Sequence, residues 1–213
     1  GAASDLERAI AEIRQITDPL RVELMCAGTH PFARWNQQKV TDKERYATLI
    51  DRTQWWGRQM LIYGVHVHVG IEDRDKVLPI IRALLTVLPQ LQSLSASSPF
   101  WGGDDTGYAS NRALMFQQLP TAGLPFQFDH WSELEQYVGD MVHTGVIDAF
   151  NEVRWDIRPA PHLGTIEVRV CDGTPTVTAP KAAAASLPPP PGQLAAPSDA
   201  GPAPPAMPRG VAQ

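Results

Sequence analysis

Valine and histidine alternate along residues 64–70, which read Gly-Val-His-Val-His-Val-Gly. Successive side chains of a β-strand point to opposite faces, so the valines would share one face and His66 and His68 the other. The run is short, rich in β-branched residues and bounded by glycines, which favours a strand over a helix. We predict a strand with an apolar core face and a histidine face, the latter being either a site or an ordinary half-exposed surface.

A second alternating stretch, residues 164–172, places isoleucine and valine on one face and Glu167 and Arg169 on the other. Two strands with apolar inner faces can pack on the same helices while their polar faces meet in one cleft. We expect the two histidines of the first strand to converge there with Glu167, Arg169 and Arg158. The competing interpretation is that Glu167 and Arg169 form a surface ion pair on an exposed sheet face.

Apolar residues recur at the three- and four-residue spacing of an amphipathic helix in four stretches. Three of them open on a capping box, and in the other Asp73 or Asp75 can cap the helix, which Pro89 should kink or end. The aromatic stripe on one of these helices is predicted to pack in the core. The predicted helices are residues 4–17, 41–60 (which carries the aromatic stripe), 73–88 and 132–144.

The sequence makes three further predictions, on residues 22–26, on the two cysteines and on the loop 95–112. Residues 22–26 are predicted to form a strand, and Cys26 and Cys171 are predicted to be buried free thiols because both fall in apolar runs. The loop 95–112 is long and aperiodic, and its aromatic residues indicate that it is packed. Arg112, at the end of this loop, is a candidate substrate contact.

Composition divides the chain in two. Residues 177–213 contain 10 of the 20 prolines, 11 alanines and no aromatic residue. Such a segment cannot bury enough apolar surface to offset the entropy of ordering it, so we predict a disordered tail. Residues 1–176 carry every aromatic side chain and are long enough for one substantial core.

Charge and hydropathy argue against nucleic acid and membranes as partners. The net charge of -5 and the absence of a basic block argue against a nucleic-acid surface. No apolar run is long enough to span a bilayer, and residues 1–8 lack the basic and apolar regions of a signal peptide. We therefore expect no membrane partner and a cytoplasmic location.

The polar residues of the two alternating strands suit phosphate chemistry. A carboxylate and an imidazole can bind a divalent cation, and Mg²⁺ sites usually complete their shell with substrate phosphates and water. Arginines beside such a metal offer planar donors to phosphate or carboxylate groups. A hydrolase with a metal centre at His66 and His68 is a weaker alternative, because no third ligand has local spacing.

Several ordered motifs across residues 4–176 resemble the bacterial carboxylate-amine ligases of the glutamate-cysteine ligase type 2 family. The resemblance implies an α+β catalytic domain with a glutamine-synthetase-like curved antiparallel sheet and helices packed on one face. The motifs that carry it are Gly28–Phe32, Gly64–Gly70, Ser95–Phe100, Thr106–Ser110, Trp155–Pro159 and Gly164–Asp172.

The resemblance also implies roles for the residues of the predicted cleft. His66 and Glu167 would be metal ligands for Mg²⁺, and His68 would contact a phosphate of ATP. Arg158 would lie near the nucleotide phosphates and Arg169 near the substrate carboxylate, which makes these two arginines the candidate catalytic residues. Arg112 and Arg169 are the candidate substrate contacts.

The reaction implied by the family is ATP-dependent. The γ-carboxylate of glutamate would be phosphorylated, and cysteine or another amine would then open the acyl phosphate to form a γ-glutamyl amide. Positioning and screening of phosphate charge suit such a reaction better than a nucleophilic side chain does. The chain could also form a homo-oligomer.

The chain departs from the family pattern in several places. No glutamate-rich strand precedes Ser4, and the change to an Ala/Pro-rich segment after Thr176 indicates a truncation or a shifted reading frame. Arg154 stands where a second tryptophan is usual, and Ala160 and His162 interrupt a more basic motif. We therefore expect an incomplete metal site and an unpaired edge strand. An inactive remnant, with at most nucleotide binding or protein association, is the alternative function.

Overall fold

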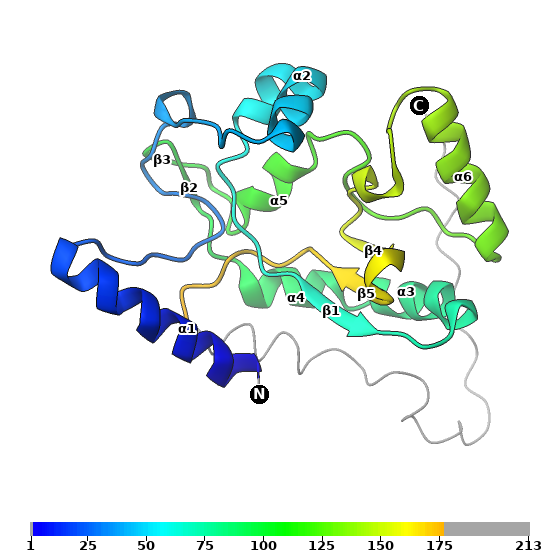
Figure 1. Cartoon of the computed structure of the whole chain (residues 1–213), viewed down its shortest axis with the longest axis horizontal. Helices are drawn as coiled ribbons and strands as arrows, with labels where there is room; N and C mark the ends of the chain where they lie inside the picture. Colours follow the sequence, from blue (N-terminus) through cyan, green and yellow to red (C-terminus); the bar gives the residue numbers. More distant parts are fainter. Residues whose placement is uncertain (1, 177–213) are drawn as a thin grey trace.

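The computed structural model describes residues 2–176, with side chains from Ser4 onward, and shows an α+β arrangement (Figure 1). The tail predicted to be disordered, residues 177–213, lies outside the described residues. The helices are α1 (Ala2–Thr17), α2 (Glu44–Arg58), α3 (Val77–Leu85), α4 (Leu88–Ser95), α5 (Asn111–Phe116) and α6 (Trp131–His143). The strands are β1 (Val67–Gly70), β2 (Phe100–Trp101), β3 (Asp104–Asp105), β4 (Ile157–Ala160) and β5 (Thr165–Val168).

Strands β1, β5 and β4 form an antiparallel sheet in the order β1-β5-β4. Both alternating stretches of the sequence thus become neighbouring strands, and the predicted pairing of their polar faces is confirmed. Glu167 of the central strand lies opposite His68 on β1 and opposite Arg158 on β4. The register therefore gathers histidine, glutamate and arginine on one face of the sheet.

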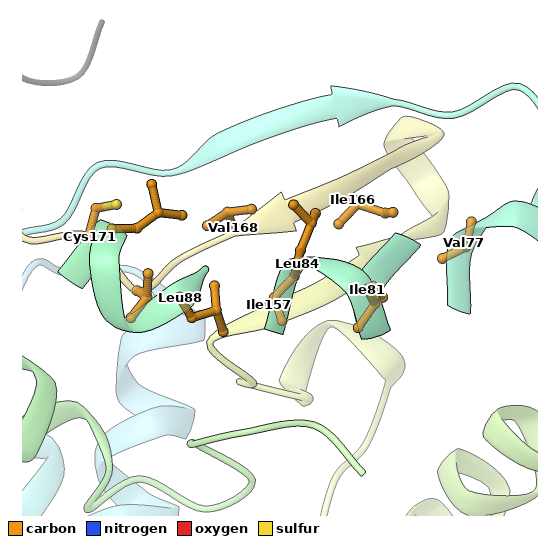
Figure 2. Packing of buried hydrophobic residues seen from close by; sticks show 10 residues of the cluster. Val77, Ile81, Leu84, Leu88, Ile157, Ile166, Val168 and Cys171 are labelled. Atoms are coloured by element: carbon orange, nitrogen blue, oxygen red, sulfur yellow. The ribbon is translucent and has the colours of Figure 1, made fainter. Parts of the chain in front are cut away.

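The other face of the sheet packs on α3 and α4 (Figure 2). Val77, Ile81 and Leu84 follow one another at the three- and four-residue spacing that puts side chains on one face of a helix. Their apolar stripe meets the isoleucine and valine face of β4 and β5. The main core cluster consists of Val77, Ile81, Leu84, Leu88, Leu91, Ile157, Ile166, Val168, Val170 and Cys171.

The predicted helix 73–88 is broken ahead of Pro89, which lacks the N–H group that a continuous helix needs, but the helix ends three residues earlier than predicted. Helix α3 ends at Leu85, and α4 begins at Leu88 with Pro89 in its first turn, where a proline is tolerated. The two helices meet at an angle of 61°. At the other end, the Asp73 carboxylate accepts a hydrogen bond from the backbone N–H of Asp75, which confirms Asp73 as a capping residue.

No single helix in the described part of the chain is long and apolar enough to cross a membrane. By length and composition only the bent pair Arg74–Leu85 and Leu88–Ser95 passes such a test, and only when the two helices are taken together.

Helix α6 covers a second, smaller core cluster formed by Leu134, Ile147, Val153 and Trp155. The predicted capping box at Ser132–Glu135 is wrong by two positions. The helix starts at Trp131, so Glu133 occupies its third position and its side chain accepts a hydrogen bond from the backbone N–H of His130. Gly145 follows the helix with a φ of +73°, the left-handed conformation that favours glycine after a helix end.

Residues 22–26 do not form the predicted strand, and Cys26 is exposed rather than buried. A strand needs a neighbour for its backbone hydrogen bonds, and within the described residues none pairs with this segment. Pairing begins only three residues after Cys26, where Thr29 bridges Ile62. Cys171, by contrast, is buried and free as predicted.

The helices at the amino-terminal side expose more apolar surface than their patterns predict. Helix α1 confirms the predicted helix, but it begins at Ala2, so Ser4 lies inside it and the predicted capping box there is wrong. This helix lies at one end of the molecule (Figure 1) and leaves the side chains of Leu6, Ile13 and Ile16 exposed. Helix α2 starts at Glu44 without a side-chain cap, so the predicted capping box there is wrong. Its aromatic stripe is not core either, since Trp56 is 39% exposed.

The long loop is anchored by the buried carboxylate of Asp172, which follows β5. This carboxylate accepts hydrogen bonds from the Ser97 N–H (3.0 Å), the Ser98 hydroxyl (2.6 Å) and the Ser110 hydroxyl (2.9 Å). A Cβ atom on Gly28 would come within 2.6 Å of the same carboxylate, so glycine is required there. The loop is therefore ordered by polar contacts, whereas the side chain of Tyr108 is exposed.

Helix α4 offers a matched test of the core. Leu91 is 1% exposed and Leu94 is 61% exposed on the same helix. Leu91→Ala should lower the free energy of unfolding by about 2–5 kcal/mol, because it removes packed apolar atoms and leaves a cavity. Leu94→Ala should change it by less than about 0.5 kcal/mol. Urea denaturation of both variants measures the difference, and equal effects would contradict the assignment of the core.

The two cysteines should differ in reactivity. In the native protein iodoacetamide should alkylate Cys26, which is exposed, and leave Cys171, which is buried in the main core, unmodified. Both should react after denaturation. Peptide mass spectrometry reads out the site of labelling, and native labelling of Cys171 at the rate of Cys26 would show that the core is not packed as described.

Candidate functional site

Glu167 is the centre of the polar face of the sheet. It lies on β5 between the two outer strands, and its side chain is only 5% exposed. Its Oε1 atom lies 2.9 Å from His66 Nδ1 and accepts a hydrogen bond of 2.5 Å from Arg169 Nη1. Its Oε2 atom accepts a hydrogen bond of 2.7 Å from Arg158 Nε. The cluster is therefore partly buried, and the interpretation as an exposed surface ion pair is wrong.

The electrostatics of this cluster keep the Glu167 carboxylate ionised. Burial alone would raise its pKa, since it removes water from the charged form. The hydrogen bonds from His66 and Arg158 and the positive charges of Arg169 and Arg158 outweigh burial, so the pKa of Glu167 lies well below its ordinary value. Burial also lowers the pKa of Arg169, and the charge of Arg158 adds to this effect.

His68 lies at the edge of the cluster. Its Nε2 atom is 3.9 Å from Glu167 Oε1, and its Nδ1 atom is 2.9 Å from the hydroxyl oxygen of Thr165. The side chains of His66 and His68 are both about one-third exposed, so each imidazole keeps one side open to solvent. The two histidines therefore flank the buried carboxylate on the side from which a ligand could approach.

The two arginines differ in how many of their donors are used. Arg158 donates from Nη1 to the carbonyl oxygens of Asn151 (2.7 Å) and Val153 (2.5 Å), in addition to its bond with Glu167. Among the described residues, the Arg169 side chain donates a single hydrogen bond, to Glu167. The guanidinium carries five N–H donors, so Arg169 retains more of its capacity for a ligand.

Arg112 is not part of the polar face. It is buried in α5, and its guanidinium donates to the carbonyl oxygens of Val170 (3.4 Å) and Arg169 (3.2 Å). A Cβ atom on Gly64 would collide with this guanidinium. The structure thus places Arg112 against the backbone that follows β5, apart from the histidines, while its role as a substrate contact stays a prediction.

A cavity of about 640 Å³ lies beside the cluster and shares Arg169 with it. The rest of its wall comes from α2, α5 and the segment before β4, and includes Arg52, Glu152 and Arg154. None of these three residues is among the site residues predicted from the sequence. One signal was present: Arg154 lies four residues before Arg158, and in an extended segment residues an even number apart face the same side.

The residues present fit part of a magnesium shell. Glu167 Oε1 and His66 Nδ1 lie 2.9 Å apart, so one ion could contact both atoms in place of the hydrogen bond between them. Among the described residues no group of three or more His, Cys, Asp and Glu side chains could hold a metal ion. A bound Mg²⁺ would therefore need phosphate oxygens or water for the rest of its shell.

The depressed pKa of Glu167 predicts a pH-dependent loss of stability. A carboxyl whose folded pKa is below its unfolded value of about 4.5 stabilises the fold above that pH and loses this effect as the pH falls. Glu167→Gln should therefore cost about 3–5 kcal/mol at pH 7, because it leaves buried arginines unpaired, and less at pH 3.

Urea denaturation of wild type and Glu167→Gln between pH 3 and pH 7 measures this difference. Glu7→Gln, on the exposed surface of α1, is the matched control and should leave the wild-type profile unchanged. A gap between wild type and Glu167→Gln that stays constant over this range would show that Glu167 is not held as an ion by its neighbours.

Sequence comparison places the chain among known proteins. The profile of the family described as glutamate-cysteine ligase family 2 (GCS2) matches residues 1–201. The chain is 66% identical over 176 residues to a protein of Arthrobacter sp. (strain FB24), provisionally named glutamate–cysteine ligase 2-1. It is also 66% identical over 172 residues to a protein of Mycobacterium ulcerans (strain Agy99), provisionally named glutamate–cysteine ligase 2.

These alignments cover most of this chain but less than half of each relative. They include 83% of the chain and 46% of the Arthrobacter protein, and 81% of the chain and 44% of the Mycobacterium ulcerans protein. The chain thus spans a little under half the length of the relatives it matches. The extent of the profile match and the level of identity nevertheless agree with the motifs of the sheet: the chain belongs to glutamate-cysteine ligase family 2.

Proposed function

We propose that the chain provides part of the catalytic site of an ATP-dependent carboxylate-amine ligase that forms a γ-glutamyl amide. The observation that carries this proposal is the buried Glu167 carboxylate, held by His66 and two arginines beside a cavity that Arg169 also lines. We further propose that the β1-β5-β4 sheet belongs to a glutamine-synthetase-like curved sheet. Family membership and the provisional names of the relatives support both proposals.

The proposed reaction has two steps. An oxygen of the glutamate γ-carboxylate attacks the γ-phosphorus of ATP, the bond to ADP breaks, and an acyl phosphate forms. The nitrogen of cysteine or another amine then attacks the acyl carbon, and inorganic phosphate leaves while the nitrogen loses a proton. Two anions approach each other in the first step, so positive charge and exact placement are the main requirements.

The residues of the cluster suit these requirements. Arg169 has donors left for a substrate carboxylate, and His68 is open to solvent at a position where a phosphate oxygen could lie. His66 and Glu167 would hold Mg²⁺, which screens phosphate charge when bound. Arg158 would act near the nucleotide phosphates, and its hydrogen bonds also hold Glu167 in place.

The alternative function is an inactive remnant that at most binds nucleotide or associates with another chain. One observation favours it: the described residues supply only part of a metal shell. The metal-dependent hydrolase gains no support, because the described residues contain no cluster of three or more ligands.

The ligase proposal predicts ADP release when the full chain is incubated with Mg-ATP, glutamate and cysteine. The release should require both amino acids, and His66→Ala and Glu167→Ala should reduce it at least about tenfold, since each removes a proposed metal ligand. Glu135→Ala, on the exposed face of α6, is the control and should keep full activity. Release no higher than that of Glu167→Ala would reject the ligase activity of this chain.

Thermal unfolding of the same samples with and without Mg-ATP distinguishes a chain that binds nucleotide from one that does not. Specific binding of Mg-ATP should raise the melting temperature when the ligand is in excess over its Kd. A raised melting temperature without ADP release would support the nucleotide-binding remnant, and no shift at all would reject nucleotide binding by this chain.

A further inference from the structure

The first part of α2, residues 44–53, forms one wall of the cavity but is not fixed by an apolar core. It contributes six lining residues, from Glu44 to Arg52, while α5 and the segment before β4 contribute other walls. Within α2, every residue of which the structure describes, only Gly57 is buried, and it lies after this part. The helix lies at the outer edge of the molecule, above α5 in Figure 1. Polar contacts must therefore hold this wall in place.

Arg52 joins this wall to the rest of the fold. Its Nη1 atom donates a hydrogen bond of 2.9 Å to Glu152 Oε2, and its Nη2 atom forms an ion pair with Asp148 Oδ1. Both carboxylates belong to a segment that is itself fixed, because Ile147 and Val153 are fully buried in the second core cluster. The side chain of Glu152 is only 19% exposed, so water competes for its bond less than on an open surface. Arg52 thus ties a weakly held helix to a firmly held segment.

The backbone of α2 is kinked at Gln54, two residues after Arg52. The φ of +49° and ψ of −121° at Gln54 lie in a region that glycine adopts readily and that a residue with a side chain adopts at a cost in energy. Such strain persists only where the surrounding structure imposes it. The bonds of Arg52 are such a constraint, since they hold the turn immediately before the kink. A helix without this constraint relaxes to ordinary helical dihedral angles.

We infer that residues 44–53 are a lid over the cavity, with Gln54 as its hinge and Arg52 as its latch. In the latched state α2 is kinked and its first part completes the cavity wall. When the bonds of Arg52 break, Gln54 relaxes to helical dihedral angles and the lid swings away from α5, which opens the cavity. Hinge strain favours the open state and the latch favours the closed state, so the loss of either one shifts the balance.

A lid gives the cavity two useful states. The open state admits and releases ligands, and the closed state excludes water from whatever is bound. A movement about one residue is typical of hinged closure, in which a single backbone position absorbs the change in dihedral angles. The lid goes beyond the proposed ligase activity and does not require it, so its test needs neither nucleotide nor substrate.

Thiol labelling measures the opening of the lid. Leu119 lines the cavity and is only 7% exposed, so Leu119→Cys places a thiol on a wall that becomes accessible when the lid opens. The native cysteines are internal controls, because Cys26 is exposed and reports the intrinsic rate, whereas Cys171 is buried in the main core and reports global unfolding. Iodoacetamide labelling of the full chain, followed by peptide mass spectrometry, gives the rate at all three positions.

Loss of the latch should open the cavity locally. In the Leu119→Cys background, Arg52→Gln should raise the labelling rate at position 119 at least about tenfold and that of Cys171 by less than about twofold, because charged hydrogen bonds are lost only at the lid. Arg58→Gln, on the exposed end of α2 beyond the hinge, is the matched control and should leave both rates unchanged. An unchanged rate at position 119 would overturn the inference, and so would an equal rise at both positions, which shows global destabilisation.

The hinge is tested in the opposite direction, which also serves if Arg52→Gln does not fold by circular dichroism. Gln54→Gly removes the cost of the positive φ, so it should favour the latched state and slow labelling at position 119 at least about threefold. Gln54→Ala keeps that cost and should not slow it. Equal rates in these two variants would overturn the inference. Labelling as expected without ADP release would reject the ligase activity alone, and ADP release without these changes in labelling would reject the lid alone.

Discussion

The constraint on which the candidate site depends is the desolvation of one carboxylate. Glu167 occupies the central strand of the sheet with almost no contact with water, and a buried charge is tolerated only when it is paired and hydrogen-bonded. Arg158 approaches it from β4, Arg169 from the residue that follows β5, and His66 from the residue that precedes β1. The orientation of these groups is therefore coupled to the pairing of all three strands.

Asp172 is a second buried carboxylate, and it acts on the Glu167 cluster indirectly, through the segment that carries Arg169. Asp172 ties the long loop to the segment after β5 through three serine residues. Arg112 follows that loop and donates to the backbone carbonyl of Arg169, so the loop fixes the end of β5 on which Arg169 stands. The glycines at positions 28 and 64 leave the space that Asp172 and Arg112 need. Polar contacts, in addition to the apolar core, therefore hold the segment after β5 in place.

Arg169 connects the two parts of the candidate site, because it binds Glu167 and lines the cavity. On one side lie the groups proposed for phosphate and magnesium, and on the other lies the cavity. A ligase has to bring a carboxylate and a phosphate together with little freedom of movement. One arginine between the two regions is suited to that purpose, since its planar donors can serve two anions at once.

The sequence by itself determined the faces of the two strands, the apolar stripe of α3 and the bend ahead of Pro89. Each of these depends on local periodicity or on a property of one residue. Only the tertiary structure decided that Arg112 is buried, that Cys26 is exposed and that Arg154 lies on the cavity wall with Arg169. Burial and proximity of this kind depend on which distant segments pack together. Residues 22–26 are an example. Their pattern suits a strand, yet without a paired neighbour among the described residues they remain irregular.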